Sequence, residues 1–393
     1  MTCWRGTKVQ LRVCGATGSV AKVRQRFREF TTGARVLLGL ATARYPLSGP
    51  RSVALNLANV CNTNCLMCPG HSPLLRDTPE LSKLGDVPFM DSALFEQIIR
   101  ESRGMGTYRV VLGGAGDPAL HPSLDSMLEL MMRLNMEPYV LTNGLALDDK
   151  RVGIWATKRA HFRFSLHAGD LDTWLRVHPG GTAVQFERLS RAIGALAAAG
   201  VPRVSTMHVI HKNNCKHVRE MVEHAHAHGV RNVLFRPVRA EGALASVVLS
   251  PEEEEHLRRD MAACLALADS YGIRTNLREY LENKLFTDDG AVQTTALYRQ
   301  IPCYIGWLYA EFDIDGMLRP CLLSQIEMGR LGERSLREIW RSPRYHAFRR
   351  EGRTMPTRGR LVKGCRCHAC CMAKYNVNVY NLLHLKSLKY GDA

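Results

Sequence analysis

The feature that most limits the fold of this chain is a regular alternation of short apolar runs and amphipathic stretches, which starts at residue 52. Six runs rich in β-branched and apolar residues have the pattern of strands: 52–58, 108–114, 138–144, 161–167, 203–210 and 232–238. Helical periodicity fills most of the intervals, at 91–103, 123–135, 183–200, 216–229 and 250–272. Strands that are each followed by a helix pair in parallel, because the helix returns the chain to the same end of the sheet. The pattern predicts an α/β fold with a parallel sheet and helices outside, either an open doubly wound sheet or an incomplete barrel.

Three cysteines, Cys61, Cys65 and Cys68, follow the first predicted strand directly. Ligand sites of both candidate architectures lie at the carboxyl ends of the strands, which is where these thiols fall. Structural zinc needs four closed ligands, and this loop supplies three, although His71 could complete the set. Three thiolates would instead hold three corners of a four-iron cluster and leave one iron open to another ligand.

The C-x3-C-x2-C spacing directly after the first strand of a βα array resembles the radical S-adenosylmethionine superfamily. The resemblance implies that the amino and carboxylate groups of S-adenosylmethionine occupy the open iron. It further implies reductive cleavage of S-adenosylmethionine to methionine and a 5′-deoxyadenosyl radical, which abstracts a hydrogen atom from the substrate. The fold implied is a partial (βα)6 TIM-like barrel, which agrees with the six strands counted independently.

Further contacts to S-adenosylmethionine are implied by the same resemblance, one position at a time. The segment GGAGDPALHP after the second strand is similar to the segment whose backbone receives the methionyl amino group, a task that suits glycine. The third and fourth strands end where the family contacts the ribose and the carboxylate. The residue before the third cysteine is often aromatic in the family and packs near adenine; here it is a methionine. The residues expected at this site are Met67, Gly113, Gly114, Asp117, Asn143 and Ser165.

A second group of cysteines lies in the last third of the chain, at positions 303, 321, 365, 367, 370 and 371. The arrangement C-x12-G-x4-C followed by C-x2-C resembles the auxiliary-cluster domains called SPASM and its shortened form, twitch. Asn376 stands where a full SPASM domain has its next cysteine, so the shortened form with one cluster is expected. Cys365 or Cys371 could replace a neighbour in the ligand set, and a zinc ribbon is the alternative. The ligands expected for a second four-iron cluster are Cys303, Cys321, Cys367 and Cys370.

The pattern of elements predicts three parts of the chain. Residues 1–50 form a basic extension, residues 51–285 form the partial barrel, and residues 286–393 form a small α+β auxiliary-cluster domain of twitch or SPASM type. The last part should begin with a hairpin at 308–323, in which Asp315 and Gly316 supply the tight turn. A helix at 335–351, broken at Pro343, should follow.

The expected chemistry follows from the second cluster. A fully ligated cluster has no open iron, so its natural role is electron transfer, which favours oxidation of the substrate, with epimerisation or dehydration as alternatives. Such a reaction needs a proton acceptor and orienting groups near the substrate. The residues expected in catalytic roles are His167, His208, Arg236 and Glu311, with Cys215 as a possible hydrogen-atom donor.

The substrate expected from the sequence is small and polar. Relatives that modify ribosomal peptides often carry a separate leader-recognition domain, whereas the first predicted strand here begins at residue 52. We therefore expect a sugar, aminocyclitol or aminoglycoside intermediate of antibiotic or other natural-product biosynthesis, with a flavodoxin or ferredoxin as electron donor. The alternative within the superfamily is a peptide-modifying enzyme.

Composition and charge bear on location and partners. The net charge of +16 comes from scattered basic residues, which does not favour nucleic acid, although a zinc-stabilised nucleic-acid-binding protein is the alternative from another class. The apolar run at 36–43 is too short to span a bilayer, and residues 1–18 lack the apolar centre of a signal peptide. A cytoplasmic location, no membrane partner and reduced cysteines are expected.

Overall fold

The computed structural model describes residues 34–36, 38–40, 46–76, 85–201, 203–238, 242–282 and 294–386. Most of the predicted N-terminal extension and the expected domain boundary at 285 lie outside the described residues.

The described strands form one ten-stranded sheet in the order β10-β9-β8-β1-β2-β3-β4-β5-β6-β7. Strands β1 to β7 run parallel to their neighbours, and β8 adds in parallel to the other side of β1. The sheet stays open, with β7 and β10 at its edges, and the prediction of an incomplete α/β barrel is confirmed. The bounds are β1 Ser52–Asn56, β2 Arg109–Gly113, β3 Glu137–Thr142, β4 His161–Ser165, β5 Arg203–Ile210, β6 Asn232–Pro237, β7 Arg274–Thr275, β8 Tyr309–Phe312, β9 Met317–Arg319 and β10 Gly329–Arg330.

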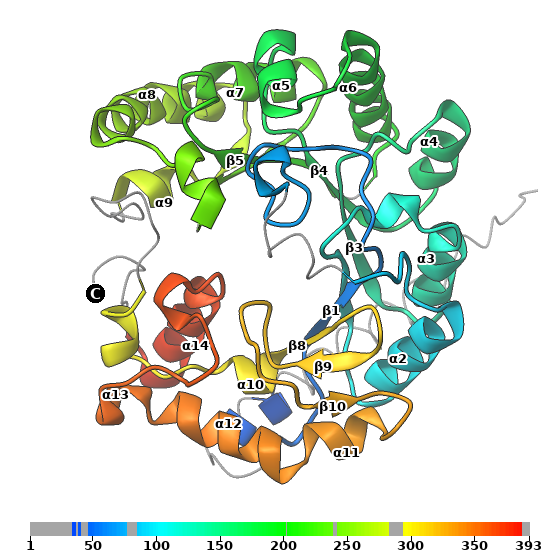
Figure 1. Cartoon of the computed structure of the whole chain (residues 1–393), viewed down its shortest axis with the longest axis vertical. Coiled ribbons are helices and arrows are strands. Elements are labelled where there is room, and N and C mark those ends of the chain that lie inside the picture. The colour runs from blue at the N-terminus through cyan, green and yellow to red at the C-terminus, as the bar shows by residue number, and fades with distance from the viewer. Residues whose placement is uncertain are drawn as a thin grey trace, which may run out of the picture.

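Helices α2 to α8 form an arc around the outside of the parallel strands (Figure 1). Side-chain caps set their starts: α6 begins at the capping box of Thr182 and Gln185, and α8 begins at that of Ser250 and Glu253. The helices of the arc are α2 Ser92–Gly104, α3 Leu124–Arg133, α4 Asp149–Ala156, α5 Leu171–Val177, α6 Ala183–Ala198, α7 Val218–Ala227 and α8 Pro251–Ser270.

The remaining helices follow α8 in the chain, and all but α9 lie in the C-terminal segment from residue 294 onward. Pro343 separates α11 from α12 as expected, because Ser342 caps the new helix and Pro343 opens it. These helices are α9 Leu277–Glu282, α10 Ile305–Leu308, α11 Leu336–Trp340, α12 Pro343–Arg353, α13 Met355–Arg358 and α14 Ala373–His384. Short 3-10 turns are η1 Pro73–Leu75, η3 Pro118–Leu120, η4 Gly242–Val247, η5 Leu297–Arg299 and η6 Cys367–Ala369.

The two faces of the sheet differ, because successive residues of a strand point to opposite sides. On β4, Phe162 and Phe164 are fully buried in the core beneath the helices, and Phe162 stacks on Trp155 of α4 at 4.3 Å between ring centroids. Arg163 and Ser165 alternate with these phenylalanines and therefore point to the other side. We call this side, which faces away from the helical arc, the inner face.

The hairpin β8–β9 joins the C-terminal segment to the barrel. Gly316 makes its turn at a φ of 81°, a conformation that favours glycine. The sequence predicted the hairpin but not its pairing with β1, in which Tyr309 lies beside Ser52 and Glu311 beside Ala54. Across the described ranges, none of the helices has the length and apolar character that a membrane span requires.

Candidate functional site

The first cysteine loop follows β1 and carries three half-buried cysteines. The hydroxyl of Thr63 lies between two of them, 3.3 Å from Cys61 Sγ and 3.4 Å from Cys65 Sγ. The backbone N–H of His71 donates to Cys68 Sγ at 3.3 Å. Burial raises the pKa of Cys65 to about 12 and also raises the pKa of Cys68. Thiolates at these positions therefore need a bound metal centre to be stable at neutral pH.

Asp117 and Asn143 support this loop from the ends of β2 and β3. The buried carboxylate of Asp117 accepts the hydroxyl of Thr142 at 2.8 Å and the backbone N–H of Asn143 at 2.6 Å. Asn143 in turn donates from Nδ2 to Asn62 Oδ1 at 2.7 Å and to Cys61 Sγ at 3.5 Å. Asp117 thus positions Asn143, and Asn143 touches the loop that carries the thiols.

The glycine-rich segment packs directly on the same loop. Gly114 has a φ of 129°, and a Cβ there would lie 2.1 Å from Asn56 Oδ1. A Cβ on Gly116 would lie 2.1 Å from the carbonyl oxygen of Val60. Only glycine permits this approach of two backbones. The contact of Gly113 and Gly114 with S-adenosylmethionine stays a prediction.

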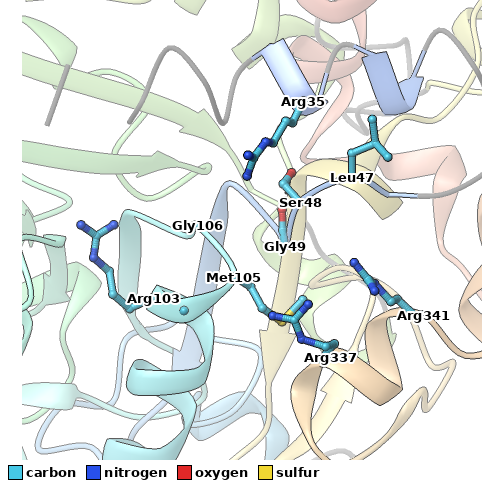
Figure 2. A pocket seen from close by; sticks show the side chains of 10 residues that line it. Arg35, Leu47, Ser48, Gly49, Arg103, Met105, Gly106, Arg337 and Arg341 are labelled. Atoms are coloured by element: carbon cyan, nitrogen blue, oxygen red, sulfur yellow. Dashed lines mark hydrogen bonds between the residues drawn. The ribbon is translucent and has the colours of Figure 1, made fainter. Parts of the chain in front are cut away.

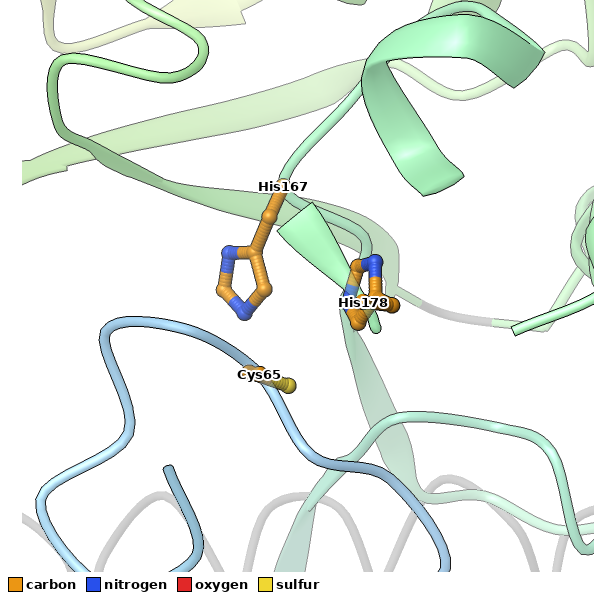
Figure 3. A group of neighbouring side chains, drawn as sticks. All are labelled: Cys65, His167 and His178. Atoms are coloured by element: carbon orange, nitrogen blue, oxygen red, sulfur yellow. The ribbon is translucent and has the colours of Figure 1, made fainter. Parts of the chain in front are cut away.

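Two buried histidines stand beside Cys65 (Figure 3). Its sulfur and one ring nitrogen from each of His167 and His178 lie within 4.8 Å of one another. His167, at a φ of 60°, accepts the backbone N–H of Val209 at Nδ1, whereas Nδ1 of His178 donates to the carbonyl of Trp174 at 3.0 Å. Burial lowers the pKa of His178 to about 4 and that of His167 well below its ordinary value. Neutral imidazoles therefore border the cysteine loop.

The spread of the three thiols fits a cluster better than a single ion. Sulfur ligands of one zinc ion lie roughly 4 Å apart, because each Zn–S bond is about 2.3 Å long. No three cysteine sulfurs of the described residues lie mutually within 4.8 Å. In a four-iron cluster each thiolate binds a different iron, which requires wider spacing. The ring of His71, the fourth ligand of the zinc alternative, lies against the backbone of Ala115 and Asn59 instead.

The second thiol site lies beside the hairpin β8–β9. Cys365 is hydrogen-bonded with both Cys321 and Cys367, and its Sγ lies 3.2 Å from Ser324 Oγ. Burial, with Cys370 as the next contributor, raises the pKa of Cys303 to about 12. The structure thus brings together the four expected ligands and adds Cys365 as a fifth thiol. Cys371 lies near the same site, because it and Cys321 both act on the Tyr309 hydroxyl. The assignment of four ligands among these six cysteines stays a prediction.

Asn376 of α14 occupies the position of the absent cysteine and organises this second site. It is fully buried, accepts the backbone N–H of Tyr304 at 2.7 Å and donates to the hydroxyl of Tyr298 at 2.8 Å. The Tyr298 hydroxyl in turn donates to Cys370 Sγ at 2.9 Å, and Asn376 Nδ2 lies 4.0 Å from Cys303 Sγ. The Asn376 amide directs N–H donors toward the sulfurs. Hydrogen bonds of this kind come from residues that surround the ligands and do not bind the metal themselves.

The inner face lies between the two thiol sites. The first site follows the carboxyl end of β1, whereas Cys321 follows β9 at the level of Tyr309, the first residue of β8. Glu311 stands between them on the inner face, 8% exposed, with Oε2 unpaired among the described residues. Burial, followed by the charge of Asp313, raises the pKa of Glu311 to about 8. A carboxyl group of this kind can exchange a proton near neutral pH.

Two residues expected in catalytic roles lie on the wrong side of the sheet for that task. His208 alternates onto the helix-facing side of β5, where its ring lies 5.5 Å from that of Phe235 and both of its nitrogens are unpaired among the described residues. Cys215 is packed in the core, with its thiol 3.6 Å from the carbonyl oxygen of Lys212. Both placements argue for packing roles, because neither side chain reaches the inner face.

The other expected residues fall near the carboxyl ends of the strands. Ser165 ends β4 on the inner face, and Arg236 lies on the inner face of β6 with an exposed side chain. Met67 is buried against Val177 and Val238 beside the cysteine loop. Arg163 was missed, although its alternation with two phenylalanines in HFRFS was a usable signal for the inner face.

A separate cavity of about 470 Å³ opens at the amino ends of β1 and β2, away from the cysteine loop (Figure 2). Arginines of three segments surround it, together with the glycines and Met105 that end α2. The strands separate it from the first thiol site, so it is not part of that site. The arginines are Arg35, Arg103, Arg337 and Arg341.

An open parallel barrel with a three-thiol loop after its first strand and a second thiol site beside it defines the class of this protein. The sequence matches the Radical SAM superfamily over residues 55–225 and an iron–sulfur cluster-binding domain of SPASM type over residues 303–372. The protein is a radical S-adenosylmethionine enzyme with a SPASM-type C-terminal domain. Its cofactors are two four-iron clusters and S-adenosylmethionine.

The relatives found include a curated protein and several solved structures. The PqqA peptide cyclase of Gluconobacter oxydans is 23% identical over 342 residues, which cover 83% of this chain and 88% of that protein. Streptococcus suis SuiB bound to its precursor peptide SuiA has a TM-score of 0.60 at 15% identity, covering 100% of this chain and 84% of that chain. The structure of anSMEcpe with bound AdoMet and the Cp18Cys peptide has a TM-score of 0.57 at 13% identity, covering 86% and 100%.

These comparisons correct the expected substrate. The expectation of a sugar, aminocyclitol or aminoglycoside is wrong, because the curated relative that matches most of the chain is a peptide cyclase. Nothing supports the expected roles in small-molecule oxidation and antibiotic biosynthesis. The error came from treating the short segment before the first strand as a sign that no peptide is recognised, although an open inner face can itself receive an extended chain.

Proposed function

We propose that this enzyme modifies a peptide, oxidising one residue so that the peptide loses two hydrogens and gains a crosslink or a double bond. The observation that carries the proposal is the match to a peptide cyclase over 83% of this chain. The open sheet is consistent with it, because β7 and β10 do not pair and an extended peptide could enter between them.

Three cysteines would hold the first cluster and four would hold the second. Cys61, Cys65 and Cys68 take the first role, with Asn143 and the N–H of His71 directed at the sulfurs. When bound, the clusters and S-adenosylmethionine supply hydrogen-atom abstraction and one-electron transfer. The residues proposed for the second cluster are Cys303, Cys321, Cys367 and Cys370.

Glu311 is the proposed proton acceptor in its ionised form, whose fraction grows as the pH approaches the raised pKa of about 8. It lies on the strand that runs between the two thiol sites, and the Tyr309 hydroxyl donates to its carboxylate. Removal of two hydrogens from a residue releases one hydrogen atom, one proton and one electron. The proton would go to Glu311 and the electron to the second site. That electron would then return to the first cluster for the next turnover or pass to an oxidised flavodoxin or ferredoxin, and a reduced carrier of the same type would supply the electron for activation.

The test uses the reconstituted full chain under anaerobic conditions, with S-adenosylmethionine, a reductant and peptides encoded by short reading frames next to its gene. We expect one peptide to lose the mass of two hydrogens. The amount of 5′-deoxyadenosine formed should rise in proportion to the amount of modified peptide. The Cys61→Ala variant is the control, and it should form neither product.

Two results would decide against the proposal. The first is 5′-deoxyadenosine formation that no candidate peptide stimulates. The second is a peptide that binds but shows no change in mass while the cofactor is cleaved.

A further inference from the structure

Two arginines of the inner face lack a counter-charge in the described part of the chain. Arg163 lies on β4 and Arg236 on β6, and the register of β4, β5 and β6 places both on the same face of the sheet. Neither has an ion pair with any described residue, and Nε of Arg163 is buried without a hydrogen-bond partner.

The described groups around Arg163 add positive charge and supply no free carboxylate. After burial, the nearby Arg236 is the main influence that lowers the pKa of Arg163, and Arg109 adds a further positive charge. The carboxylate of Glu137 is already shared: it lies 3.1 Å from Arg109 and 2.9 Å from His161 Nε2. The other groups facing Arg163 are the phenols of Tyr139 and Tyr375, and neither supplies a carboxylate.

A half-buried guanidinium without an anion is unfavourable, because burial removes water from the charge without replacing it by a partner. A carboxylate bound by the half-buried Arg163 recovers that cost through charge-assisted hydrogen bonds, and the exposed Arg236 adds a second positive charge on the same face. The arrangement is therefore suited to an anionic ligand group rather than to an apolar one.

The position of the pair indicates which ligand that group belongs to. Arg163 lies two residues before Ser165, so it lies deeper in the inner face than the strand ends that surround the first cysteine loop. Tyr375, which faces it, belongs to α14, the helix that follows Cys370 and carries Asn376. Arg236 is the fifth of the six residues of β6 and lies near the carboxyl end of that strand, so a carboxylate held by both arginines would extend from that edge toward the deeper Arg163.

We propose that Arg163 and Arg236 form a subsite that binds a carboxylate of the peptide substrate and thereby places an acidic residue, or the carboxyl terminus, between the two clusters. The inference rests on the proposed peptide function and names the chemistry by which the peptide is held. It makes both arginines positioning residues.

The test measures protection of arginines from phenylglyoxal, read residue by residue by mass spectrometry on the reconstituted enzyme. Four probes are used. N-acetylglutamate α-amide carries only a side-chain carboxylate, N-acetylglutamine α-amide is its neutral isostere, N-acetylalanine carries only a terminal carboxylate, and S-adenosylmethionine is the cofactor. We expect the glutamate derivative to slow modification of Arg163 and Arg236 several-fold, and the neutral glutamine isostere to leave it unchanged. Arg337 and Arg341 of the cavity in Figure 2 serve as internal controls and should react at the same rate throughout.

The arms separate the sources of the carboxylate. Protection by the glutamate derivative alone would indicate that the subsite binds an acidic side chain. Protection by N-acetylalanine as well would indicate that it also accepts a carboxyl terminus, and both outcomes support the subsite. Protection by S-adenosylmethionine alone would assign the pair to the cofactor and overturn the inference. Equal protection of all four arginines would mean nonspecific binding of anions and would also overturn it.

A variant checks that the two arginines act together. Arg163→Gln should abolish protection of Arg236, Arg163→Lys should keep part of it, and the matched Arg337→Gln should keep all of it. Because these readouts need no turnover, they fail or succeed independently of the peptide assay, and the two proposals can be judged apart.

Discussion

At the residue scale, Glu311 is the side chain whose environment departs most from that of an ordinary surface carboxylate. It is buried on the inner face, one oxygen is unpaired among the described residues, and its pKa is raised from 4.5 to about 8. Desolvation is the main cause, because the charged form loses water that the Tyr309 hydroxyl only partly replaces.

This pKa predicts a pH dependence of stability. Between pH 4.5 and 8 the unfolded chain releases the Glu311 proton while the folded chain keeps it, so the free energy of unfolding falls as the pH rises through that range. Glu311→Gln should remove that part of the slope and be more stable than the parent above pH 8 by on the order of 2 to 4 kcal/mol. Anaerobic urea unfolding at a series of pH values measures it.

The control for this prediction is Glu187→Gln, a substitution at an exposed position of α6 that should leave the slope unchanged. Parallel pH profiles for the parent and the Glu311→Gln variant would show that the carboxyl group titrates normally.

At the scale of elements, helix α14 shows how the C-terminal segment compensates for a missing ligand. Asn376 connects α14 to the residues before β8 through its bonds with Tyr304 and Tyr298. The sequence indicated only that a cysteine was absent at this position. The hydrogen bonds of Asn376 near the second thiol site could not be predicted from the sequence, because their partners Tyr304 and Tyr298 are 72 and 78 residues away along the chain.

Asn376→Leu should therefore destabilise the protein by roughly 2 to 4 kcal/mol, because it leaves the buried N–H of Tyr304 without its acceptor and removes one of the two hydrogen bonds of the Tyr298 hydroxyl. It should also lower the iron retained at the second site. Asn378→Leu, on the exposed side of the same helix, should change stability by less than about 0.5 kcal/mol. Urea midpoints and iron content are the measurements, and equal behaviour of the two variants would exclude the anchoring role of Asn376.

At the scale of the whole molecule, two thiol sites lie at opposite ends of one strand pair, β1 and β8. Parallel pairing of Ser52–Leu55 with Tyr309–Phe312 makes one sheet of the barrel strands and the C-terminal hairpin. The inner face is therefore bounded by both cofactor sites, which suits a reaction that removes a hydrogen atom at one end and an electron at the other.

The two sites should load iron separately. The reconstituted chain should hold about eight irons, and the triple variant with alanine at Cys61, Cys65 and Cys68 should keep about four, held by the C-terminal thiols. Iron and sulfide analysis after anaerobic reconstitution tests this. Zinc in place of iron, or loss of all iron in the triple variant, would contradict the assignment of two independent sites.

What the sequence by itself determined are the local features: the six barrel strands, most of the helices between them but not α4 or α5, the turn at Gly316, the helix break at Pro343 and the two groups of cysteines. These follow from periodicity, capping and ligand spacing, which act over a few residues. The tertiary structure decided which faces those residues occupy and what they meet. It turned His208 toward the helices, set Glu311 beside β1 and placed Cys365 among the expected ligands. It also left Arg163 and Arg236 without an ion pair to any residue that the structure describes. Such outcomes depend on sheet register and on contacts between distant segments, because a shift of one residue along a strand moves a side chain to the other face.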